Sequence, residues 1–171
     1  NVPFTGEVSA IGRSGKFKDG KKNGEWLYFY ENGQLEIKEN YKDGKLDGLL
    51  EIYWDNGQLQ FLINYKDGIK DGLSEIYWDN GQLTSKSNYK DGKLDGLFET
   101  YGQNGQLWGR NNYKNDKIHG LSEDYWDNGR LQRKQNYKYG LLDGLQEYYN
   151  QDGSLKRTET WKEGKKIETN P

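Results

Sequence analysis

The chain has 171 residues, a mean hydropathy of −1.21, and 25 basic against 27 acidic residues, which leaves a net charge of −2. The sequence has no cysteine and no long apolar run, which excludes a disulfide scaffold, a thiol enzyme and a transmembrane helix, and the near-neutral charge argues against nucleic-acid binding. Such low hydropathy is common in disordered chains, but those are poor in aromatic residues, whereas this sequence has 6 Trp, 14 Tyr and 5 Phe.

The chain repeats itself every 24 residues without insertions. The string at 41–49 returns at 89–97, and Ile11 falls in the register of a leucine column of the later repeats. The aromatic residues that open the repeats are Phe17, Tyr41, Tyr65, Tyr89, Tyr113, Tyr137 and Trp161. We therefore expect a single array over residues 1–171, with partial repeat 1–16, full repeats 17–40, 41–64, 65–88, 89–112, 113–136 and 137–160, and partial repeat 161–171.

Two turn signals divide each repeat into two extended runs. The first is Asp43-Gly44 and the second is Asn56-Gly57, a pair that favours a tight hairpin because both residues tolerate positive φ. The runs between the turns have lengths typical of strands and lack the 3.6-residue apolar period of a helix. The sequence therefore predicts an all-β fold, an elongated single antiparallel meander of stacked β-hairpins with about 14 strands.

The columns of the array predict which side chains face the core, with positions counted from the opening aromatic of each repeat. Positions 1, 9, 11, 13 and 19 are all odd, so a strand of period two can place them on one face, which we expect to be the core. The glutamates of position 11 are expected to accept hydrogen bonds from neighbouring tyrosines or from turn backbone. In repeat 41–64 the five residues are Tyr41, Leu49, Glu51, Tyr53 and Leu59.

The Asn-Gly turn leaves two registers open. With a two-residue turn, the repeat positions of two paired residues add up to 33. This register sets glutamates opposite basic residues, as in Glu99 and Arg110. A three-residue turn with a glycine bulge pairs positions that sum to 32 and brings Tyr53 next to Leu59. We favour the bulged turn because burial of two large side chains stabilises by more than an exposed ion pair, which contributes at most about 1 kcal/mol.

The even positions 12 and 14 are rich in aromatic and branched aliphatic residues. If the odd positions form the core, these side chains form a stripe on the opposite surface, and exposed aromatic patches usually mark contacts. The candidate binding residues are Tyr28, Tyr30, Ile52, Trp54, Ile76, Trp78 and Trp126. The alternative is that sheet curvature or a second molecule covers the stripe, and the sequence does not decide between the two.

No catalytic site, metal site or cofactor is predicted. His119, the single histidine, occupies a column otherwise made of Asp and Asn, so we expect a turn residue that accepts a local hydrogen bond. Asp43 and Asp47 could present oxygens to Ca²⁺, but Asp-Gly is a common turn pair and the EF-hand spacing is absent. The acids recur in identical surroundings, which argues against a hydrolase. The lysines after each opening aromatic, from Lys18 to Lys162, are expected to protect the sheet from aggregation.

The motifs resemble a known repeat. The string Tyr-Lys-Asp-Gly-Lys-Leu-Asp-Gly, then Tyr-Trp or Tyr-Tyr, then Asn-Gly-Gln-Leu resembles the MORN-repeat variant of bacterial proteins, many of them labelled YwqK-family antitoxins. The resemblance runs from Phe17 to Gly164 and implies an elongated hairpin array that serves as a scaffold for proteins or lipids. The sequence departs from its own pattern at Gly102, which replaces an aromatic residue, and at Asp116, which replaces a turn glycine.

Two functions follow from these features. The first is a non-catalytic repeat scaffold that binds a protein partner through the stripe, and the resemblance implies a toxin as that partner. The alternative is a cell-envelope or secreted module that binds carbohydrate or lipid headgroups through the same aromatic side chains. Self-association is also open, and no nucleic-acid partner is expected. The sequence does not decide localisation, although a chain that begins at Asn1 favours the envelope or secretion over the cytoplasm.

Overall fold

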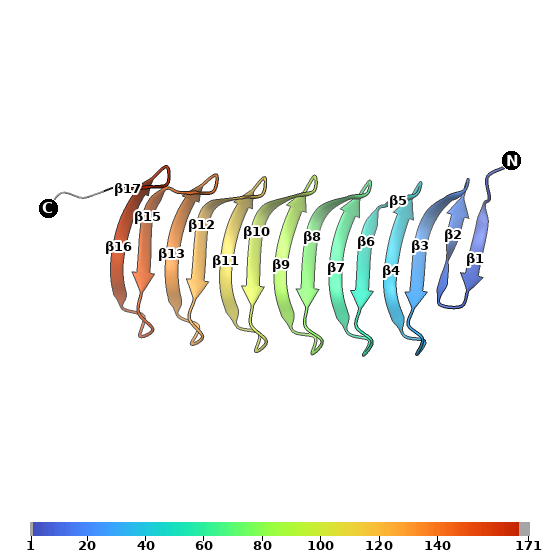
Figure 1. Cartoon of the computed structure of the whole chain (residues 1–171), viewed down its shortest axis with the longest axis horizontal. Coiled ribbons are helices and arrows are strands. Elements are labelled where there is room, and N and C mark those ends of the chain that lie inside the picture. Colours follow the sequence, from blue (N-terminus) through green and yellow to red (C-terminus); the bar gives the residue numbers. More distant parts are fainter. Residues whose placement is uncertain (1, 168–171) are drawn as a thin grey trace. The chain divides into compact units, whose positions relative to one another are not determined.

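The computed structural model of the chain describes residues 2–167, and all regular secondary structure in this range is β-strand. The strands form one antiparallel sheet of 17 strands, which confirms the predicted meander of hairpins (Figure 1). The strands are β1 (Gly6–Ala10), β2 (Arg13–Lys18), β3 (Lys21–Phe29), β4 (Leu35–Lys42), β5 (Lys45–Leu46), β6 (Gly48–Tyr53), β7 (Leu59–Lys66), β8 (Ile69–Tyr77), β9 (Leu83–Lys90), β10 (Lys93–Tyr101), β11 (Leu107–Lys114), β12 (Lys117–Tyr125), β13 (Leu131–Lys138), β14 (Leu141–Leu142), β15 (Gly144–Tyr149), β16 (Leu155–Lys162) and β17 (Lys165–Ile167).

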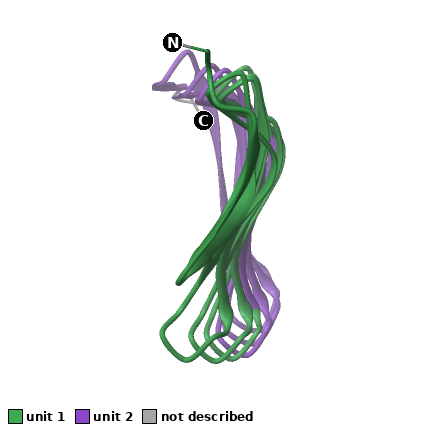
Figure 2. Cartoon of the chain, turned by 90° about the vertical axis from the view of Figure 1, so that its right-hand side faces the viewer, with its two compact units in different colours: residues 1–82, 89–92 green, residues 83–88, 93–171 purple. Residues whose placement is uncertain are grey.

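The chain divides into two compact units (Figure 2). Unit 1 comprises residues 1–82 and 89–92, and unit 2 comprises residues 83–88 and 93–171, so β9 contributes to both. The strands of each unit curve along their length (Figure 2). The strand number exceeds the predicted 14 because two strands are interrupted, one between β5 and β6 and one between β14 and β15, and because β1 and β2 form a hairpin of their own.

The N-terminal hairpin is shorter than a full repeat. Ala10 pairs with Arg13, so Ile11 and Gly12 alone form the turn. Ile11 is therefore fully exposed at this turn and does not continue the leucine column of position 19, contrary to the sequence-based expectation. The physical reason is the tight turn, which omits the longer loop that the other repeats place before that column.

The turn at positions 3 and 4 of each full repeat, most often Asp-Gly, is a two-residue hairpin turn. Asp43 and Gly44 both have positive φ, 50° and 85°, which is the geometry of a type I′ turn and matches the twist of the flanking strands. The N–H of Gly44 also donates to the carbonyl of Lys22 in the preceding repeat at 2.9 Å, so each turn is held by its neighbour. Asn115 and Asp116 adopt φ values of 48° and 64°, so the departure at Asp116 preserves a left-handed backbone.

The Asn-Gly turn contains the predicted glycine bulge. Gly57 has a φ of 83°, and its N–H donates to the carbonyl of Trp54 at 2.9 Å. The N–H of Trp54 donates in turn to the carbonyl of Gln58 at 2.8 Å. This turn pairs Tyr53 with Leu59, as the register that sums to 32 predicts.

The rest of the hairpin follows the other register. The pairing shifts one residue beyond Tyr53, and Ile52 then pairs with Phe61. In unit 2, Glu99 pairs with Arg110 in the register that sums to 33. Both predicted registers therefore occur within one hairpin, because a second bulge at position 20 absorbs one residue. The prediction of the bulged register is therefore correct only for the pair next to the turn.

Two columns of asparagine, at positions 16 and 24, connect adjacent strands and turns. Asn64 Nδ2 donates to the carbonyl of Leu73 at 2.8 Å. The same bond is made by Asn40, Asn88, Asn112 and Asn136. At the Asn-Gly turn, Asn56 accepts a hydrogen bond from the N–H of Gln58 and donates one to the carbonyl of Asp79. These side chains satisfy backbone groups that lack a ladder partner, and the sequence reasoning did not recognise the position-24 column.

The second bulge also decides which columns share a face. Positions 9, 11 and 13 lie together as predicted, and the hydroxyl of Tyr77 donates to Glu75 at 2.7 Å. The opening aromatics lie on the other face, because Tyr65 pairs with Gly48 and therefore points to the side of the even positions 10 and 12. We call the face with positions 9, 11 and 13 the leucine face. The aromatic face carries positions 6, 10, 12, 21 and 23 together with the opening aromatics.

The most buried apolar side chains lie on the aromatic face. Among residues 2–167 these are Trp26, Leu50 and Ile63, at positions 10 and 23. In contrast, Leu145 and Leu155 retain 47% and 55% of their accessible surface, although their columns were predicted to form the core. The prediction of a core made only of odd positions is therefore wrong, because the extra residue of the bulge reverses the alternation of side chains partway through each repeat.

The tyrosine–glutamate pairs of the leucine face predict a loss of stability at high pH. Burial, and then the hydrogen bond to a carboxylate, raises the pKa of Tyr53 and of Tyr77 from 10 to about 12. Because the folded state holds these protons more tightly than the unfolded state, their contribution is complete below pH 10 and is lost as the pH rises through about 12. We expect the melting temperature to fall across this window. Circular dichroism should show a shallower fall in a Tyr53→Phe/Tyr77→Phe variant, and an equally steep fall would contradict the assignment.

Candidate binding face

A continuous row of large side chains crosses unit 1 on the aromatic face. The register pairs Tyr28 with Ile37, and Ile37 with Ile52. It then pairs Ile52 with Phe61, and Phe61 with Ile76. All five side chains are half-buried, and each comes from a different strand among β3, β4, β6, β7 and β8. We call these five residues the apolar row.

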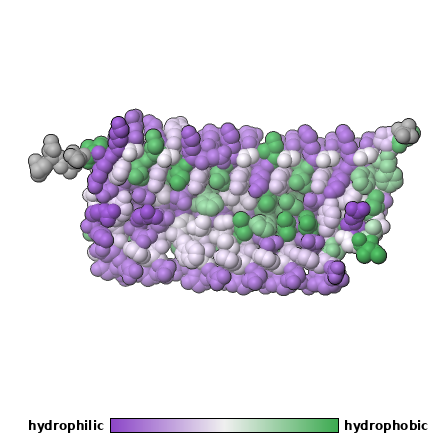
Figure 3. Space-filling model, in the orientation of Figure 1, coloured by the Kyte–Doolittle hydropathy of each residue, from purple (hydrophilic) through white to green (hydrophobic). Residues whose placement is uncertain are grey.

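The apolar row borders buried residues. Leu50 and Ile63 pair with each other two residues along the same strands, and both are buried. Figure 3 shows hydrophobic side chains gathered in unit 1 around the middle of the strands. The row therefore offers partly exposed apolar surface on a packed support, an arrangement suited to a binding surface.

The predicted stripe supplies three members of the apolar row: Tyr28, Ile52 and Ile76. The other two, Ile37 and Phe61, occupy position 21 and were missed. Position 21 is odd, so period-two reasoning assigns it to the opposite face, and only the bulge at position 20 brings it to this one. The register in which paired positions sum to 33 would have predicted these two residues, because it pairs position 12 directly with position 21.

The position-14 members of the stripe lie beside the Asn-Gly turns and are half-buried, not exposed. The hydroxyl of Tyr30 donates to the carbonyl of Tyr53 at 2.6 Å. Among the described residues, the indole Nε1 atoms of Trp54, Trp78 and Trp126 are buried without a hydrogen-bond partner. The polar edge of each of these rings is therefore shielded from solvent. Trp54 and Trp78 belong to unit 1, whereas Trp126 belongs to unit 2.

An aromatic cluster surrounds Trp26, next to Tyr28 of the apolar row. The Trp26 ring is edge-on to Phe17 with centroids 4.9 Å apart, and its centroid is 6.5 Å from that of Tyr28. Lys22 Nζ lies 4.7 Å from the Trp26 centroid, donates to Tyr28 at 2.5 Å and pairs with Glu39 at 3.4 Å. Burial lowers the pKa of Lys22, but hydrogen bonds to two tyrosine hydroxyls and the charge of Glu39 outweigh it, so the pKa is raised.

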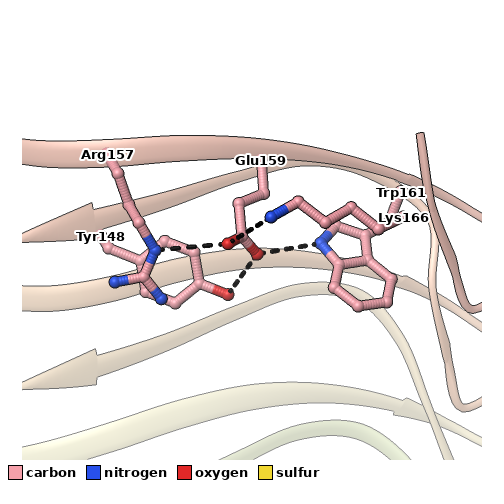
Figure 4. Close-up of polar contacts among 5 residues, drawn as sticks. All are labelled: Tyr148, Arg157, Glu159, Trp161 and Lys166. Carbon is pink, nitrogen blue, oxygen red and sulfur yellow. Dashed lines mark hydrogen bonds and ion pairs between the residues drawn. The ribbon is translucent and has the colours of Figure 1, made fainter. Parts of the chain in front are cut away.

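In unit 2 the same columns carry a polar network centred on Glu159 (Figure 4). Its carboxylate binds Lys166 at 2.9 Å and Arg157 at 3.3 Å, and accepts from Trp161 Nε1 at 3.2 Å and from the hydroxyl of Tyr148 at 3.4 Å. The hydrogen bond from Lys166, against a smaller opposing effect of burial and with the help of Trp161 and Arg157, lowers the pKa of Glu159 to about 2. The carboxylate is thus held ionised by its donors and connects β15, β16 and β17, which suits a structural ion pair.

His119 accepts a backbone hydrogen bond, as predicted, but it lies in β12 and the donor belongs to the following repeat, so the prediction of a turn residue with a local bond is wrong. Its Nδ1 accepts from the N–H of Tyr139 at 3.3 Å, and the two rings lie 4.5 Å apart. Asp47 occupies the same column and accepts from the N–H of Asp67 at 3.2 Å. The carboxylates of this column therefore serve the backbone of the next turn. Among the residues that the structure describes, no group of three or more His, Cys, Asp or Glu side chains could hold a metal ion.

The repeats match a known family. A family model described as MORN repeat variant matches residues 22–43, 46–67, 70–91, 94–115, 118–139 and 142–163. The chain belongs to the MORN repeat variant family. Each matched MORN repeat begins five residues after an opening aromatic, so the family repeat and the 24-residue period are the same unit in a different phase. A comparison with curated proteins returned no match.

The six MORN repeats make the chain a repeat scaffold, and such repeats commonly bind proteins or membrane lipids. In residues 2–167, no helix has the length and apolar character needed to span a membrane. The backbone framework of turns and asparagine bonds recurs from repeat to repeat, whereas positions 10, 12, 21 and 23 of the aromatic face vary. The variable positions are therefore the ones that can distinguish this MORN-repeat chain from another in what it binds.

Proposed function

We propose that the chain is a non-catalytic MORN-repeat scaffold whose apolar row binds a protein partner. The observation that supports this is the row itself, in which five strands each present a large, half-buried side chain. The core of a protein interface is typically rich in aromatic and aliphatic residues and poor in charge. A cognate toxin is the specific partner that the resemblance to antitoxin-labelled relatives implies.

The charge of the row favours a protein over an anionic membrane. Recognition of anionic headgroups relies on clusters of lysine and arginine. The apolar row contains no basic residue. The basic residues at its Tyr28 end are Arg13, which pairs with Tyr28, and Lys22, whose charge is already paired with Glu39. Binding to carbohydrate or to lipid headgroups is therefore tested below as the alternative outcome.

Phe61→Asp is expected to weaken partner binding by at least about 30-fold, because a carboxylate at the centre of a desolvated apolar contact costs about 2 kcal/mol or more. The partner is first captured by placing a photo-crosslinking phenylalanine analogue at position 61 of the full chain. After irradiation in native lysate, adducts are identified by mass spectrometry. Calorimetry with the purified partner then compares the wild type with Phe61→Asp.

Leu62→Asp is the matched control, because Leu62 is the adjacent half-buried residue and points to the leucine face. We expect this variant to keep the wild-type affinity within about two-fold. Anionic vesicles and a glycan array are tested in parallel. Adducts made only with lipid, or equal affinity of Phe61→Asp and the wild type, would refute the proposed interface. A Trp54→Ala/Trp78→Ala variant tests whether the position-14 rings take part, and unchanged binding would exclude them.

A further inference from the structure

Repeat 137–160 departs from the pattern of the array at its two-residue turn. Position 3 is Tyr139, where the other repeats have Asp, Asn or Glu, and position 5 is Leu141, where the other repeats have Lys or, once, Ile69. Tyr139 and Leu141 are 56% and 51% exposed. We call these two residues the rim pair. The turn does not need them, because the same backbone conformation forms in other repeats with charged residues in both columns.

The backbone of Tyr139 has a conformation that tyrosine rarely adopts. Its φ is 50°, in the left-handed region that Asn and Asp tolerate best, and Asp43, Asp67 and Asp91 occupy the same column with nearly the same φ. The Tyr139 ring lies against His119 of the preceding repeat, with 4.5 Å between the centroids. Residues kept in such conformations cluster at functional sites. The exposed tyrosine therefore calls for a role outside the turn.

A hollow of about 390 Å³ opens beside the rim pair, within unit 2. Its lining residues are Lys138, Tyr139, Leu141, Asp143 and Glu163. The Leu141 side chain extends to the next turn, since its Cδ2 would lie 3.3 Å from a Cβ on Gly164. The hollow therefore lies between two successive turns, and an exposed tyrosine stands beside it.

The same columns form a smaller hollow in unit 1, of about 150 Å³, around Ile69. Asp67 there takes the place of the tyrosine, and Lys66, Asp71 and Asp91 complete the lining. This hollow has one apolar side chain among four charged ones. It therefore provides a matched comparison for the larger hollow, in which an aromatic and an aliphatic side chain lie together.

The charges of the larger hollow are self-complementary. Asp143 is occupied within the chain, since its Oδ2 lies 3.5 Å from Lys162 Nζ and accepts from the N–H of Glu163 at 3.2 Å. The remaining charged side chains are Lys138, next to Tyr139, and Glu163, in the following turn. A two-fold axis through the rim pair brings each of these charges to the opposite charge of a second copy.

We propose that this hollow is the contact through which two copies of the chain form a weak, two-fold symmetric dimer. Tyr139 of each copy enters the hollow of the other and packs against Leu141. Lys138 of each copy then lies opposite Glu163 of the other. A two-fold contact uses the same patch on both copies, which suits a surface where an exposed side chain and a hollow are neighbours.

The contact is small, so we expect a dissociation constant of about 0.1–1 mM. The hollow belongs to unit 2, whereas the apolar row belongs to unit 1. The dimer is therefore independent of the proposed protein partner, and Phe61→Asp should leave it unchanged.

The test is sedimentation equilibrium of the full chain at concentrations up to about 1 mM, where we expect reversible dimerisation. Tyr139→Asp and Leu141→Lys should each weaken dimerisation by about 10-fold or more, because a charge replaces an apolar contact. Both variants introduce residues that other repeats have in these columns, so both should fold. Ile69→Lys, the same change in the smaller hollow, is the matched control and should dimerise as the wild type does.

A charge exchange tests the two-fold arrangement itself. Lys138→Glu sets carboxylates against carboxylates in the dimer, and Glu163→Lys sets ammonium groups against ammonium groups, so each variant alone should be monomeric. An equimolar mixture of the two variants should dimerise again, because both charge contacts of the mixed dimer then join opposite charges.

Three results would overturn the proposal. The first is a wild-type chain that stays monomeric at about 1 mM. The second is dimerisation that neither Tyr139→Asp nor Leu141→Lys weakens. The third is a mixture of the two charge variants that associates no more than its components do. Circular dichroism reports whether each variant is folded, so a loss of dimerisation is separated from a loss of structure.

Discussion

Trp26→Ala lowers the free energy of unfolding by about 3–5 kcal/mol, the loss expected for truncating a buried tryptophan. Trp26 is only 3% exposed, and its ring lies so close to Gly15 that a Cβ there would be 2.2 Å from the indole. Its Nε1 also donates to the carbonyl of Lys16 at 3.1 Å. Alanine leaves a cavity, orphans this carbonyl and removes the ring next to the Lys22 ammonium. Urea unfolding followed by circular dichroism measures the change.

Trp108→Ala is the control for this prediction, because it removes the same side chain from a site that is about half exposed. We expect a loss of about 1 kcal/mol or less. Gly15→Ala tests the same contact from β2, because the alanine Cβ would overlap the Trp26 ring. If Trp26→Ala cost no more than Trp108→Ala, the assignment of Trp26 to the packed centre of unit 1 would fail.

Gln146→Ala is expected to cost about 2–4 kcal/mol, the largest effect in unit 2. The side chain of Gln146 is fully buried. Its Oε1 accepts from the N–H of Asn136 at 3.1 Å, and its Nε2 donates to the carbonyls of Asn136 and Gly144 at 3.2 and 3.1 Å. These bonds span the interruption between β14 and β15, where the ladder itself is broken. Alanine leaves three backbone groups with fewer partners and adds a cavity.

Gln146→Leu separates the contribution of the buried volume from that of the hydrogen bonds. Leu50 occupies the same position in repeat 41–64 and is buried, so leucine fits the column. We expect Gln146→Leu to restore volume without the hydrogen bonds and to cost about 1–2 kcal/mol. Gln151→Ala, at an exposed turn position, should change the free energy of unfolding by less than about 0.5 kcal/mol. Equal stability of Gln146→Ala and Gln151→Ala would show that the buried hydrogen bonds contribute nothing.

The MORN-repeat framework is physically separate from the variable residues at positions 12 and 21. Turns, bulges and the asparagine bonds use backbone groups and recur in each unit, so their geometry does not depend on the residues at positions 12 and 21. The row of paired positions 12 and 21 is apolar in unit 1, where Ile52 meets Phe61, and polar in unit 2, where Asp124 meets Arg133. One backbone can therefore present different chemistry by substitution at these columns, which is how a repeat scaffold diversifies its partners.

Local signals in the sequence were sufficient for the class of the fold. The 24-residue period, the Asp-Gly and Asn-Gly turns and the resemblance to MORN repeats together predicted an antiparallel meander, because each turn is specified by residues that tolerate positive φ. The hydrogen bond from Tyr77 to Glu75 was also predictable. This bond joins two residues of one strand, so their columns and spacing are enough to predict it.

Tertiary structure decided which residues meet across strands. The bulge at position 20 adds one residue to one strand of each hairpin, and this places Ile37 and Phe61 beside Ile52. Counting alternate residues along one strand cannot predict this placement of Ile37 and Phe61. A bulge forms only when the pairing of two strands favours two different registers within one hairpin. The sequence by itself determined a meander of MORN repeats and three of the five residues of its candidate binding row. Long-range pairing determined the two faces, the other two residues of the row and the exposed position of Trp108 at the bulge.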